Sequence, residues 1–300
     1  MSKTVFVTGG AGYVGSHSAK AFARAGWEVV TYDNLSRGWR DLVKWGPLIE
    51  GDILDTDALT TALKDVRPDA VAHFAAFAYV DESMKQPEMY YRNNVSGTLS
   101  LLEAMRAAEV KRMVFSSSCA TYGVHSDLIT ESTVQSPINP YGASKMICER
   151  IIQDYGMAHG LQSVILRYFN AAGCDTEGET GERHDPEPHG IPRAIMGAMD
   201  GTFQFNIFGG DYDTPDGTPV RDYVHVSDLA DAHWRALDYL DRGGESDVFN
   251  LGTGRGYSVL ELADAVSKVA GHTVPRTISG RRPGDPPSLV ASAEKAERVL

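Results

Sequence analysis

The chain has 300 residues, of which 42% are hydrophobic, and this is enough for one large or two ordinary domains with a sizeable core. Lys and Arg number 28 against 40 Asp and Glu, and the net charge of −12 argues against a general nucleic-acid surface. No apolar run is as long as a membrane span, and no signal peptide is visible at the start. We therefore expect a cytoplasmic protein with no membrane partner, in which the three scattered cysteines are reduced thiols.

The first predicted element is a short buried strand over residues 4–8, followed by a glycine-rich turn and a helix. Gly9, Gly12 and Gly15 fit the spacing GxxGxxG, and Gly10 in place of Gly9 gives GxGxxG. A turn of this kind directs backbone N–H groups at the helix N-terminus toward a pyrophosphate. Because a strand and a helix flank the turn, the motif predicts dinucleotide binding more specifically than the glycines alone would.

A second predicted strand over residues 28–32 ends in Asp33. This acid follows Gly15 at close to the spacing of about 20 residues expected for a residue that hydrogen-bonds the adenine ribose. A carboxylate there would repel a 2′-phosphate, so the sequence favours NAD over NADP. Arg37 and Arg40 lie nearby and weaken that argument a little.

Strands and helices continue to alternate, which indicates a doubly wound parallel α/β sheet with right-handed crossovers. Strands are predicted over 48–51, 70–76, 113–116 and 163–168, with helices ending near 64 and spanning about 87–108 and 141–158. Ligands of such sheets bind beyond the C-terminal ends of the strands. The glycine turn, Asp33, Asp52, Ala75 and Ser118 all fall on that edge.

Tyr141 and Lys145 are four residues apart on a predicted helix, so their side chains share one face. A tyrosine hydroxyl has a pKa of about 10 in water, and a nearby cation favours the phenolate. Such a pair is usually an ordinary surface feature when it stands alone. Here it begins at the same sheet edge as Ser118, which makes Tyr141 a candidate general base and Ser118 a candidate hydrogen-bond donor.

Gly, Pro and acidic residues crowd positions 173–190, which are predicted to form a loop. His184, Asp185, Glu187 and His189 in this loop have side chains that can bind metals. Two prolines and irregular spacing argue against a metal site, and we expect a solvated loop that binds no metal.

The chain is expected to divide into a nucleotide-binding domain and a smaller mixed α/β lobe that binds substrate. The first comprises residues 1–171, to which 220–245 returns, and the second comprises 172–219 and 246–300.

Several longer sequence motifs occur in order along nearly the whole chain. They are TGGAGYVGSH (8–17), DNL (33–35), EGDI (50–53), HFAA (73–76), NNVSGT (93–98), SSS (116–118), YGASK (141–145), LRYFN (166–170), VRDYVHV (220–226) and NLG (250–252). In these motifs the chain resembles the extended short-chain dehydrogenase/reductase family, and within it the UDP-glucose (UDP-galactose) 4-epimerases. The resemblance implies a Rossmann sheet domain with bound NAD and a UDP-sugar as substrate.

The activity implied by the resemblance is 4-epimerisation of the UDP-sugar, an isomerase reaction of galactose metabolism. It passes through a transient 4-keto sugar, and the NAD is retained. Tyr141 is implied as the base, Ser118 as the group that orients the same sugar oxygen, and Lys145 as the residue that holds the nicotinamide ribose and lowers the pKa of Tyr141.

The family's binding residues carry over to positions of this chain. Cofactor contacts are implied for Gly9, Gly12, Tyr13, Val14, Gly15, Asp33, Asn34, Asp52, Ile53, Phe74, Ala75, Asn93, Tyr141, Lys145 and Tyr168. Substrate contacts are implied for Ser118, Asn170, Phe208, Arg221, Arg282 and Asp285. Arg221 and Arg282 would bind the diphosphate, for which the planar guanidinium is suited. The structural alternative for Arg221 is an ion pair with Asp222 or Asp285.

The chain departs from the family pattern at Ala78, Ala194 and Leu289, which are expected to line the sugar pocket. They leave open a different nucleotide sugar, such as a UDP-N-acetylhexosamine or a UDP-pentose. Family members usually continue past the point that corresponds to Leu300, so this chain is expected to be a shortened form. They commonly dimerise through two long helices, here about 87–108 and 141–158, and we expect a homodimer.

The same scaffold supports three other functions. A dehydratase of the same scaffold would need an Asp-Glu pair where this chain has Cys119 and Ala120. A non-enzymatic NAD-binding regulator usually lacks the tyrosine or the lysine, and both are present. A net dehydrogenase would release the keto sugar and the reduced cofactor, which the sequence does not decide.

Overall fold

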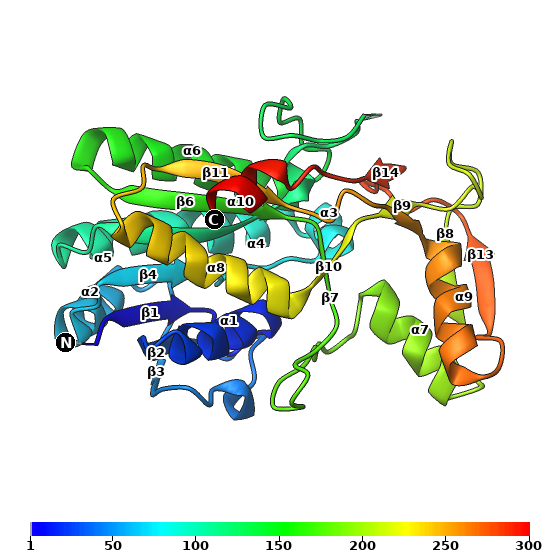
Figure 1. Cartoon of the computed structure of the whole chain (residues 1–300), viewed down its shortest axis with the longest axis horizontal. Helices are drawn as coiled ribbons and strands as arrows, with labels where there is room; N and C mark the ends of the chain where they lie inside the picture. Colours follow the sequence, from blue (N-terminus) through cyan, green and yellow to red (C-terminus); the bar gives the residue numbers. More distant parts are fainter. Residues whose placement is uncertain (1, 126) are drawn as a thin grey trace.

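The computed structural model describes residues 2–125 and 127–300 of the chain. The larger part is built on a sheet of strands β1 (Thr4–Thr8), β2 (Glu28–Asp33), β3 (Leu48–Glu50), β4 (Ala70–His73), β5 (Arg112–Ser118), β6 (Gln162–Tyr168) and β11 (Asp247–Leu251). They lie in the order β11-β6-β5-β4-β1-β2-β3, and all neighbours are parallel (Figure 1). The predicted doubly wound α/β sheet is confirmed.

Helices cover both faces of this sheet. They are α1 (Tyr13–Arg24), α2 (Thr56–Val66), α3 (Val80–Lys85), α4 (Pro87–Tyr90), α5 (Gly97–Ala107), α6 (Pro140–His159) and α8 (Val226–Asp241), with short helical turns η1 (Arg40–Leu42) and η3 (Cys119–Thr121). Successive β1 residues point to opposite faces, as strand geometry requires. Val5 and Val7 pack in the core beneath α1 and α8, whereas Phe6 packs in the core beneath α2, α5 and α6.

The helical region predicted over 87–108 is interrupted by a π-helical turn. The turn η2 (Tyr91–Ser96) joins α4 to α5 and carries the two asparagines of the NNVSGT motif. Asn94 is buried, and its side-chain oxygen accepts a hydrogen bond from the Phe77 N–H. Its side-chain nitrogen donates to the Phe77 carbonyl and to the Ser144 hydroxyl. π-helical turns of this kind are frequent near functional sites, and here the turn ties the chain after β4 to α6.

The smaller lobe, at the right of Figure 1, has its own core. Strand β8 (Phe205–Phe208) pairs in parallel with β13 (Arg276–Ser279), and helices α7 (Gly190–Met199) and α9 (Val259–Ala270) pack beside them. The short strands β7 (Asn170–Ala172) and β10 (Tyr223–His225) form one small sheet, and β12 (Tyr257–Ser258), β9 (Val220–Arg221) and β14 (Ser288–Leu289) form another. These short sheets lie between the lobe and the large sheet.

One part of the expected domain division is wrong. Residues 246–300 were assigned to the smaller lobe, yet β11 is an edge strand of the large sheet and the final helix α10 (Glu294–Val299) packs beside it. The reason is that Phe249 and Val248 pack into the hydrophobic cores on the two faces of the large sheet. In addition, the Lys295 ammonium on α10 donates to the Asp247 carboxylate and to the Val248 carbonyl of β11. The remaining boundaries stay predictions.

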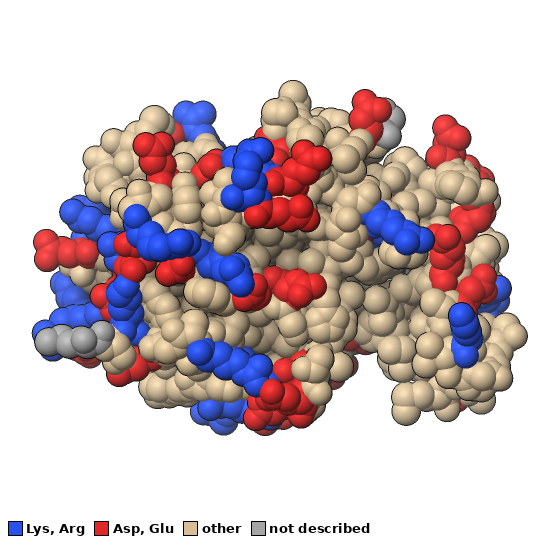
Figure 2. Space-filling view, viewed as in Figure 1, with Lys and Arg blue, Asp and Glu red and all other residues tan. Residues whose placement is uncertain are grey.

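The surface seen in Figure 2 has Lys and Arg interspersed with Asp and Glu, and it is notched between the larger part and the smaller lobe. None of the helices in the described ranges combines the length and the apolar character needed to cross a membrane.

Candidate active site

A cavity of about 680 Å³ lies between the C-terminal edge of the large sheet and the smaller lobe. Its volume is in the range of sites that hold small molecules and cofactors. One wall is formed by the glycine turn and by the ends of β2, β4, β5 and β6, and the other by residues of the smaller lobe and the loop before α7. We call these the sheet wall and the lobe wall.

The glycine turn has little room for side chains. Gly9 has a φ of +76°, and a Cβ there would come within 2.5 Å of the backbone nitrogen of Ala75. A Cβ at Gly15 would clash with the carbonyl oxygen of Gly9. Gly12 caps α1 without a side-chain hydrogen bond, and the first turn of α1 holds no acid. The free N–H groups at this helix end fit the pyrophosphate of a dinucleotide.

Asp33 stands beside this turn at the end of β2. Its Oδ2 accepts a hydrogen bond from the Ala11 N–H at 3.0 Å, and its Oδ1 accepts one from the Leu35 N–H at 2.8 Å. Burial raises the pKa of this carboxyl, and the two backbone hydrogen bonds oppose the rise. The acid lines the cavity in a fixed position, as ribose binding would require.

Most of the residues predicted to contact the cofactor line the cavity. They are Gly9, Gly12, Tyr13, Val14, Gly15, Asp33, Asn34, Ile53, Phe74, Ala75, Asn93, Tyr141 and Tyr168. Asp52 and Lys145 are not among the lining residues. Asp52 accepts hydrogen bonds from the Asn34 side chain at 3.0 Å and from the Leu54 N–H at 2.8 Å, so it supports a lining residue.

Ser118 and Tyr141 lie together in the lining of the cavity. Ser118 ends β5, and Tyr141 lies in the first turn of α6, where Asn139 caps the helix by accepting from the Gly142 N–H at 2.8 Å. Pro140 occupies the first position of α6, where its lack of an N–H has no cost. Burial raises the pKa of Tyr141, the nearby Tyr168 adds to the rise, and a hydrogen bond with Ser118 opposes it.

Lys145 lies one turn along α6 and is buried. Its ammonium donates to the Ser116 carbonyl at 2.8 Å and lies 4.8 Å from the centroid of the Phe115 ring. Burial lowers the pKa of Lys145 to about 8. The sequence predicted that Lys145 lowers the pKa of Tyr141. In this arrangement the ammonium donates to the strand and burial dominates the pKa of Tyr141, so the lowering, which was to be helped by the charge of bound NAD, stays a prediction.

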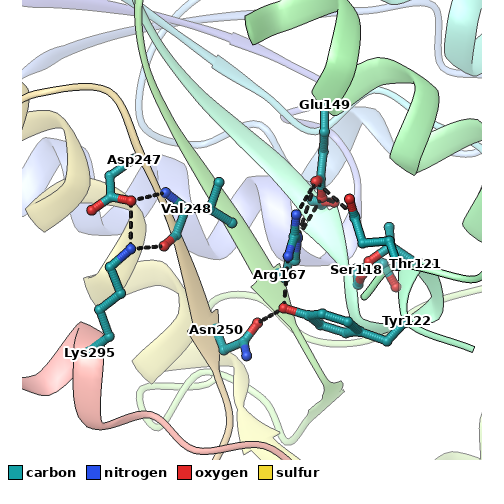
Figure 3. Close-up of polar contacts among 11 residues, drawn as sticks. Ser118, Thr121, Tyr122, Glu149, Arg167, Asp247, Val248, Asn250 and Lys295 are labelled. Atoms are coloured by element: carbon teal, nitrogen blue, oxygen red, sulfur yellow. Dashed lines mark hydrogen bonds and ion pairs between the residues drawn. The ribbon is translucent and has the colours of Figure 1, made fainter. Parts of the chain in front are cut away.

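A buried polar network of Glu149, Arg167 and Tyr122 lies beside Ser118 (Figure 3). Arg167 on β6 forms an ion pair with Glu149 on α6, with Nη2 and Oε2 2.6 Å apart, and its Nη1 donates to the Tyr122 hydroxyl at 2.9 Å. Glu149 also accepts from the hydroxyl of Ser117, the residue before Ser118. The network therefore fixes α6 against the strand that carries Ser118.

The predicted substrate residues Ser118, Asn170, Phe208, Arg221, Arg282 and Asp285 all line the cavity. On the lobe wall the Arg221 guanidinium forms an ion pair with Asp285 and donates to the Val220 carbonyl at 2.8 Å. This is one of the two structural pairings considered for Arg221. Arg282 lies over the Phe208 ring, 4.2 Å from its centroid. Two guanidinium groups at one end of the cavity suit an anionic ligand.

The three departures from the family pattern do not share one environment. Ala78 and Leu289 line the cavity, and Leu289 is 6% exposed. Ala194 was also expected to line the pocket, and that prediction is wrong. It is fully buried in the core of the smaller lobe, where α7 packs against α9.

The sequence interpretation missed a cluster on the lobe wall. The loop before α7 was expected to be solvated, but Glu182, His184, Glu187 and His189 line the cavity and are only partly exposed. Their neighbouring charges outweigh burial, so the pKa of His189 is raised to about 9 and that of Glu187 is lowered to about 2. The four residues are irregularly spaced in the sequence and come together only because the loop folds back on itself. Glu182 also precedes the stretch 184–189 in which metal-binding side chains were recognised.

Known proteins resemble this chain over almost all of its length. The model of the NAD dependent epimerase/dehydratase family matches residues 5–252. A UDP-glucose 4-epimerase of Rhizobium meliloti is 53% identical, over 100% of this chain and 92% of that relative.

Two solved structures are also similar. The UDP-glucose 4-epimerase of Brucella ovis in complex with NAD has a TM-score of 0.95 at 50% identity, covering 99% of this chain and 92% of that one. The UDP-glucose 4-epimerase of Bifidobacterium longum in complex with NAD⁺ and UDP has a TM-score of 0.94 at 38% identity, with the same coverage of 99% and 92%.

Proposed function

Because this chain belongs to the NAD dependent epimerase/dehydratase family, we propose that it interconverts UDP-glucose and UDP-galactose by NAD-dependent epimerisation at C4 of the sugar. One observation carries the proposal. The Ser118 and Tyr141 hydroxyls line the same cavity as the glycine turn and the two arginines of the lobe wall. A dinucleotide and a nucleotide sugar would thus meet beside the Tyr141 hydroxyl, the candidate proton acceptor.

The chain's residues divide the work at the reacting carbon. Tyr141 takes the proton from the C4 hydroxyl and later returns it, and Ser118 hydrogen-bonds the same oxygen and orients it. The bond from Lys145 to the Ser116 carbonyl keeps the first turns of α6 at the end of β5. As the family resemblance implies, Lys145 would hold the nicotinamide ribose. Tyr141 is buried, which limits the access of water to its side chain.

NAD fits the sheet wall, where the glycine turn would hold its pyrophosphate and Asp33 its adenine ribose. When bound, NAD supplies a reversible hydride acceptor and the positive ring that favours the Tyr141 phenolate. The sugar would invert at C4 with no net oxidation, so turnover consumes no cofactor and the same NAD can serve repeated cycles. On the lobe wall, Arg221 and Arg282 would bind the diphosphate, Phe208 the uracil side and Asp285 the ribose.

The test is nuclear magnetic resonance of the purified protein with UDP-galactose and no added NAD, beside the Tyr141→Phe variant. We expect UDP-glucose signals to grow with the wild type and to be absent with the variant. A wild type that retains NAD but leaves UDP-galactose unconverted would contradict the proposed substrate. Accumulation of a keto sugar with reduced cofactor would instead establish a net dehydrogenase.

A second candidate is 4-epimerisation of another nucleotide sugar. It is favoured by Leu289, which lines the cavity where some family members carry a bulky tyrosine, and by the small Ala78. The same experiment with UDP-N-acetylglucosamine and UDP-xylose distinguishes the candidates. We expect UDP-galactose to be converted fastest.

We also propose that the protein is a homodimer that works in the cytoplasm. Tyr91 and Leu99 on the α4–α5 segment are 39% and 38% exposed, and Met157 near the end of α6 is 78% exposed. The two helices pack side by side, so these apolar side chains lie on adjoining helices that a second copy could cover. We expect light scattering to give twice the chain mass and Leu99→Asp to give the monomer mass. A wild type of single-chain mass would refute the dimer.

A further inference from the structure

Four metal-binding side chains from one loop meet on the lobe wall. Glu182, His184, Glu187 and His189 each present a nitrogen or oxygen atom, and these atoms all lie within 4.8 Å of one another. All four residues line the cavity. Two imidazoles and two carboxylates form a mixed ligand set that suits divalent transition metals.

The distances within the cluster fit a shared central ion. The Nδ1 of His184 lies 3.3 Å from Glu187 Oε2 and 3.5 Å from Glu182 Oε1. The Nδ1 of His189 lies 3.1 Å from Glu187 Oε1 and 2.7 Å from Glu182 Oε1. A tetrahedral ion with bonds of about 2.0–2.2 Å separates neighbouring ligand atoms by about 3.4 Å. Three of the four distances are within a few tenths of an ångström of that value, and the two histidines face different oxygens of Glu187.

One ligand oxygen in the cluster is buried without a hydrogen bond. The Glu182 side chain is 9% exposed, and its Oε1 receives no hydrogen bond of acceptable geometry, although two imidazole nitrogens are near. An unsatisfied buried carboxylate oxygen is costly, and it is uncommon in folded proteins. A cation between the four groups would satisfy this oxygen.

Charge balance favours a divalent cation. Two carboxylates carry two negative charges, which can be neutralised by protons on both imidazoles or by one divalent ion with both imidazoles neutral. The exchange leaves the net charge of the cluster unchanged, so a divalent ion can replace two protons without leaving an unpaired buried charge.

A second group of acids shows the contrasting case. Asp175, Glu177 and Glu179 also place their oxygens within reach of one cation, but that position is filled. The buried ammonium of Lys20 lies 2.7, 2.9 and 2.6 Å from the three carboxylates. The ammonium of Lys20 takes the place of an ion, whereas no Lys or Arg side chain forms an ion pair with the Glu182 or Glu187 carboxylate in the described part of the chain.

We propose that Glu182, His184, Glu187 and His189 bind one divalent transition-metal ion of the Zn²⁺ class on the lobe wall. The site goes beyond the proposed epimerase activity and does not depend on it. His184 packs edge-on against Tyr13 and Tyr79, with ring centroids 6.2 and 5.7 Å apart. The ion would therefore fix the loop before α7 against the helix that follows the glycine turn.

Cobalt is the probe, because four-coordinate Co²⁺ absorbs visible light and takes zinc sites. Untagged protein with its retained cofactor is freed of metal with a chelator and titrated with Co²⁺. We expect visible bands that saturate at one Co²⁺ per chain and vanish when Zn²⁺ is added. The double variant His184→Ala with His189→Ala should show no bands, whereas His272→Ala, which removes an exposed histidine, should match the wild type.

Absence of saturable bands in the wild type, or their survival in the double variant, would overturn the site. The near-isosteric Glu182→Gln variant guards against misfolding, with its fold checked by circular dichroism. We expect its Zn²⁺ affinity, measured by competition with a coloured indicator, to fall roughly 10–100-fold. An unchanged Zn²⁺ affinity in a folded Glu182→Gln protein would equally refute the site.

Discussion

The two walls of the cavity are held in place in different ways. On the sheet wall, Ser118 ends a strand and Tyr141 begins a capped helix, and the Glu149–Arg167 network fixes both elements from behind. On the lobe wall, the charged groups lie in loops and on a two-residue strand, and some pair with one another, as Arg221 does with Asp285. The sheet wall is therefore preorganised, whereas an anionic ligand must compete for groups of the lobe wall.

This difference suggests that the sheet wall carries out the chemistry and the lobe wall binds the ligand. Chemistry at a carbon atom requires positions fixed within fractions of an ångström, which regular elements with buried partners supply. Ligand binding tolerates, and can use, groups that exchange partners. We expect substitutions on the sheet wall to change turnover or stability, and those on the lobe wall to change affinity.

The largest effect is expected from Tyr141→Phe, which removes the proton acceptor and leaves the ring. The kcat should fall by roughly 10²–10⁴ with little change in KM. Steady-state kinetics with UDP-galactose provide the measurement, and Tyr155→Phe on the same helix is the control. A variant that keeps most of its turnover would remove Tyr141 from the chemistry.

Arg167→Met tests whether the sheet wall is held by its buried network. The change leaves the Glu149 carboxylate buried without its charged partner, and we expect the free energy of unfolding to fall by about 3–5 kcal/mol. The control Arg150→Met breaks the exposed pair with Asp154 and should cost less than about 0.5 kcal/mol. Urea unfolding measures both, and equal losses would show that the buried network is not special.

The buried His233 on α8 should make the free energy of unfolding depend on pH. Burial lowers the pKa of His233 to about 4, and its Nδ1 contacts the Leu229 carbonyl at 2.7 Å. Between pH 6.5, the ordinary histidine value, and about pH 4, the unfolded chain binds a proton that the native state does not. The contribution of neutral His233 to the free energy of unfolding is therefore fully present above that range. It is lost as the pH falls through the range, because protonation then stabilises the unfolded chain.

Replacing His233 with Leu should therefore make acid unfolding less steep. In that range the slope of the unfolding free energy against pH should fall by up to about 1.4 kcal/mol per unit. Urea unfolding at several pH values provides the measurement, with the exposed His272→Leu as control. An unchanged slope in His233→Leu would mean that His233 is not kept neutral by the fold.

The smallest effect is expected on the lobe wall. Arg282→Leu removes one cation from the end of the cavity, and KM should rise roughly tenfold, equal to about 1.4 kcal/mol, while kcat changes little. Arg281→Leu is the matched control, because Arg281 is exposed and pairs with Asp211. A loss of kcat as large as that of Tyr141→Phe would break the division between the walls.

Local patterns in the sequence predicted much of the sheet wall, whereas Phe208, Arg221, Arg282 and Asp285 on the lobe wall were predicted only from the family resemblance, and all four line the cavity. The glycine turn, Asp33, Ser118 and Tyr141 lie in or beside regular elements, so local spacing and strand order already place them at one edge. The position of β11 and the burial of Ala194 were missed, because both depend on packing between segments distant in the chain. The direction of the Lys145 ammonium and the cluster around Glu182 also depend on tertiary contacts that no periodic pattern records.

The most direct test of the division between the walls is the affinity for UDP, which has the nucleotide and diphosphate but no sugar to react. Calorimetry would compare the wild type, Tyr141→Phe and Arg282→Leu, each with its retained cofactor. We predict that Tyr141→Phe binds UDP within about twofold of the wild type, and that Arg282→Leu binds it roughly tenfold more weakly. Equal weakening in both variants, or none in Arg282→Leu, would contradict the account.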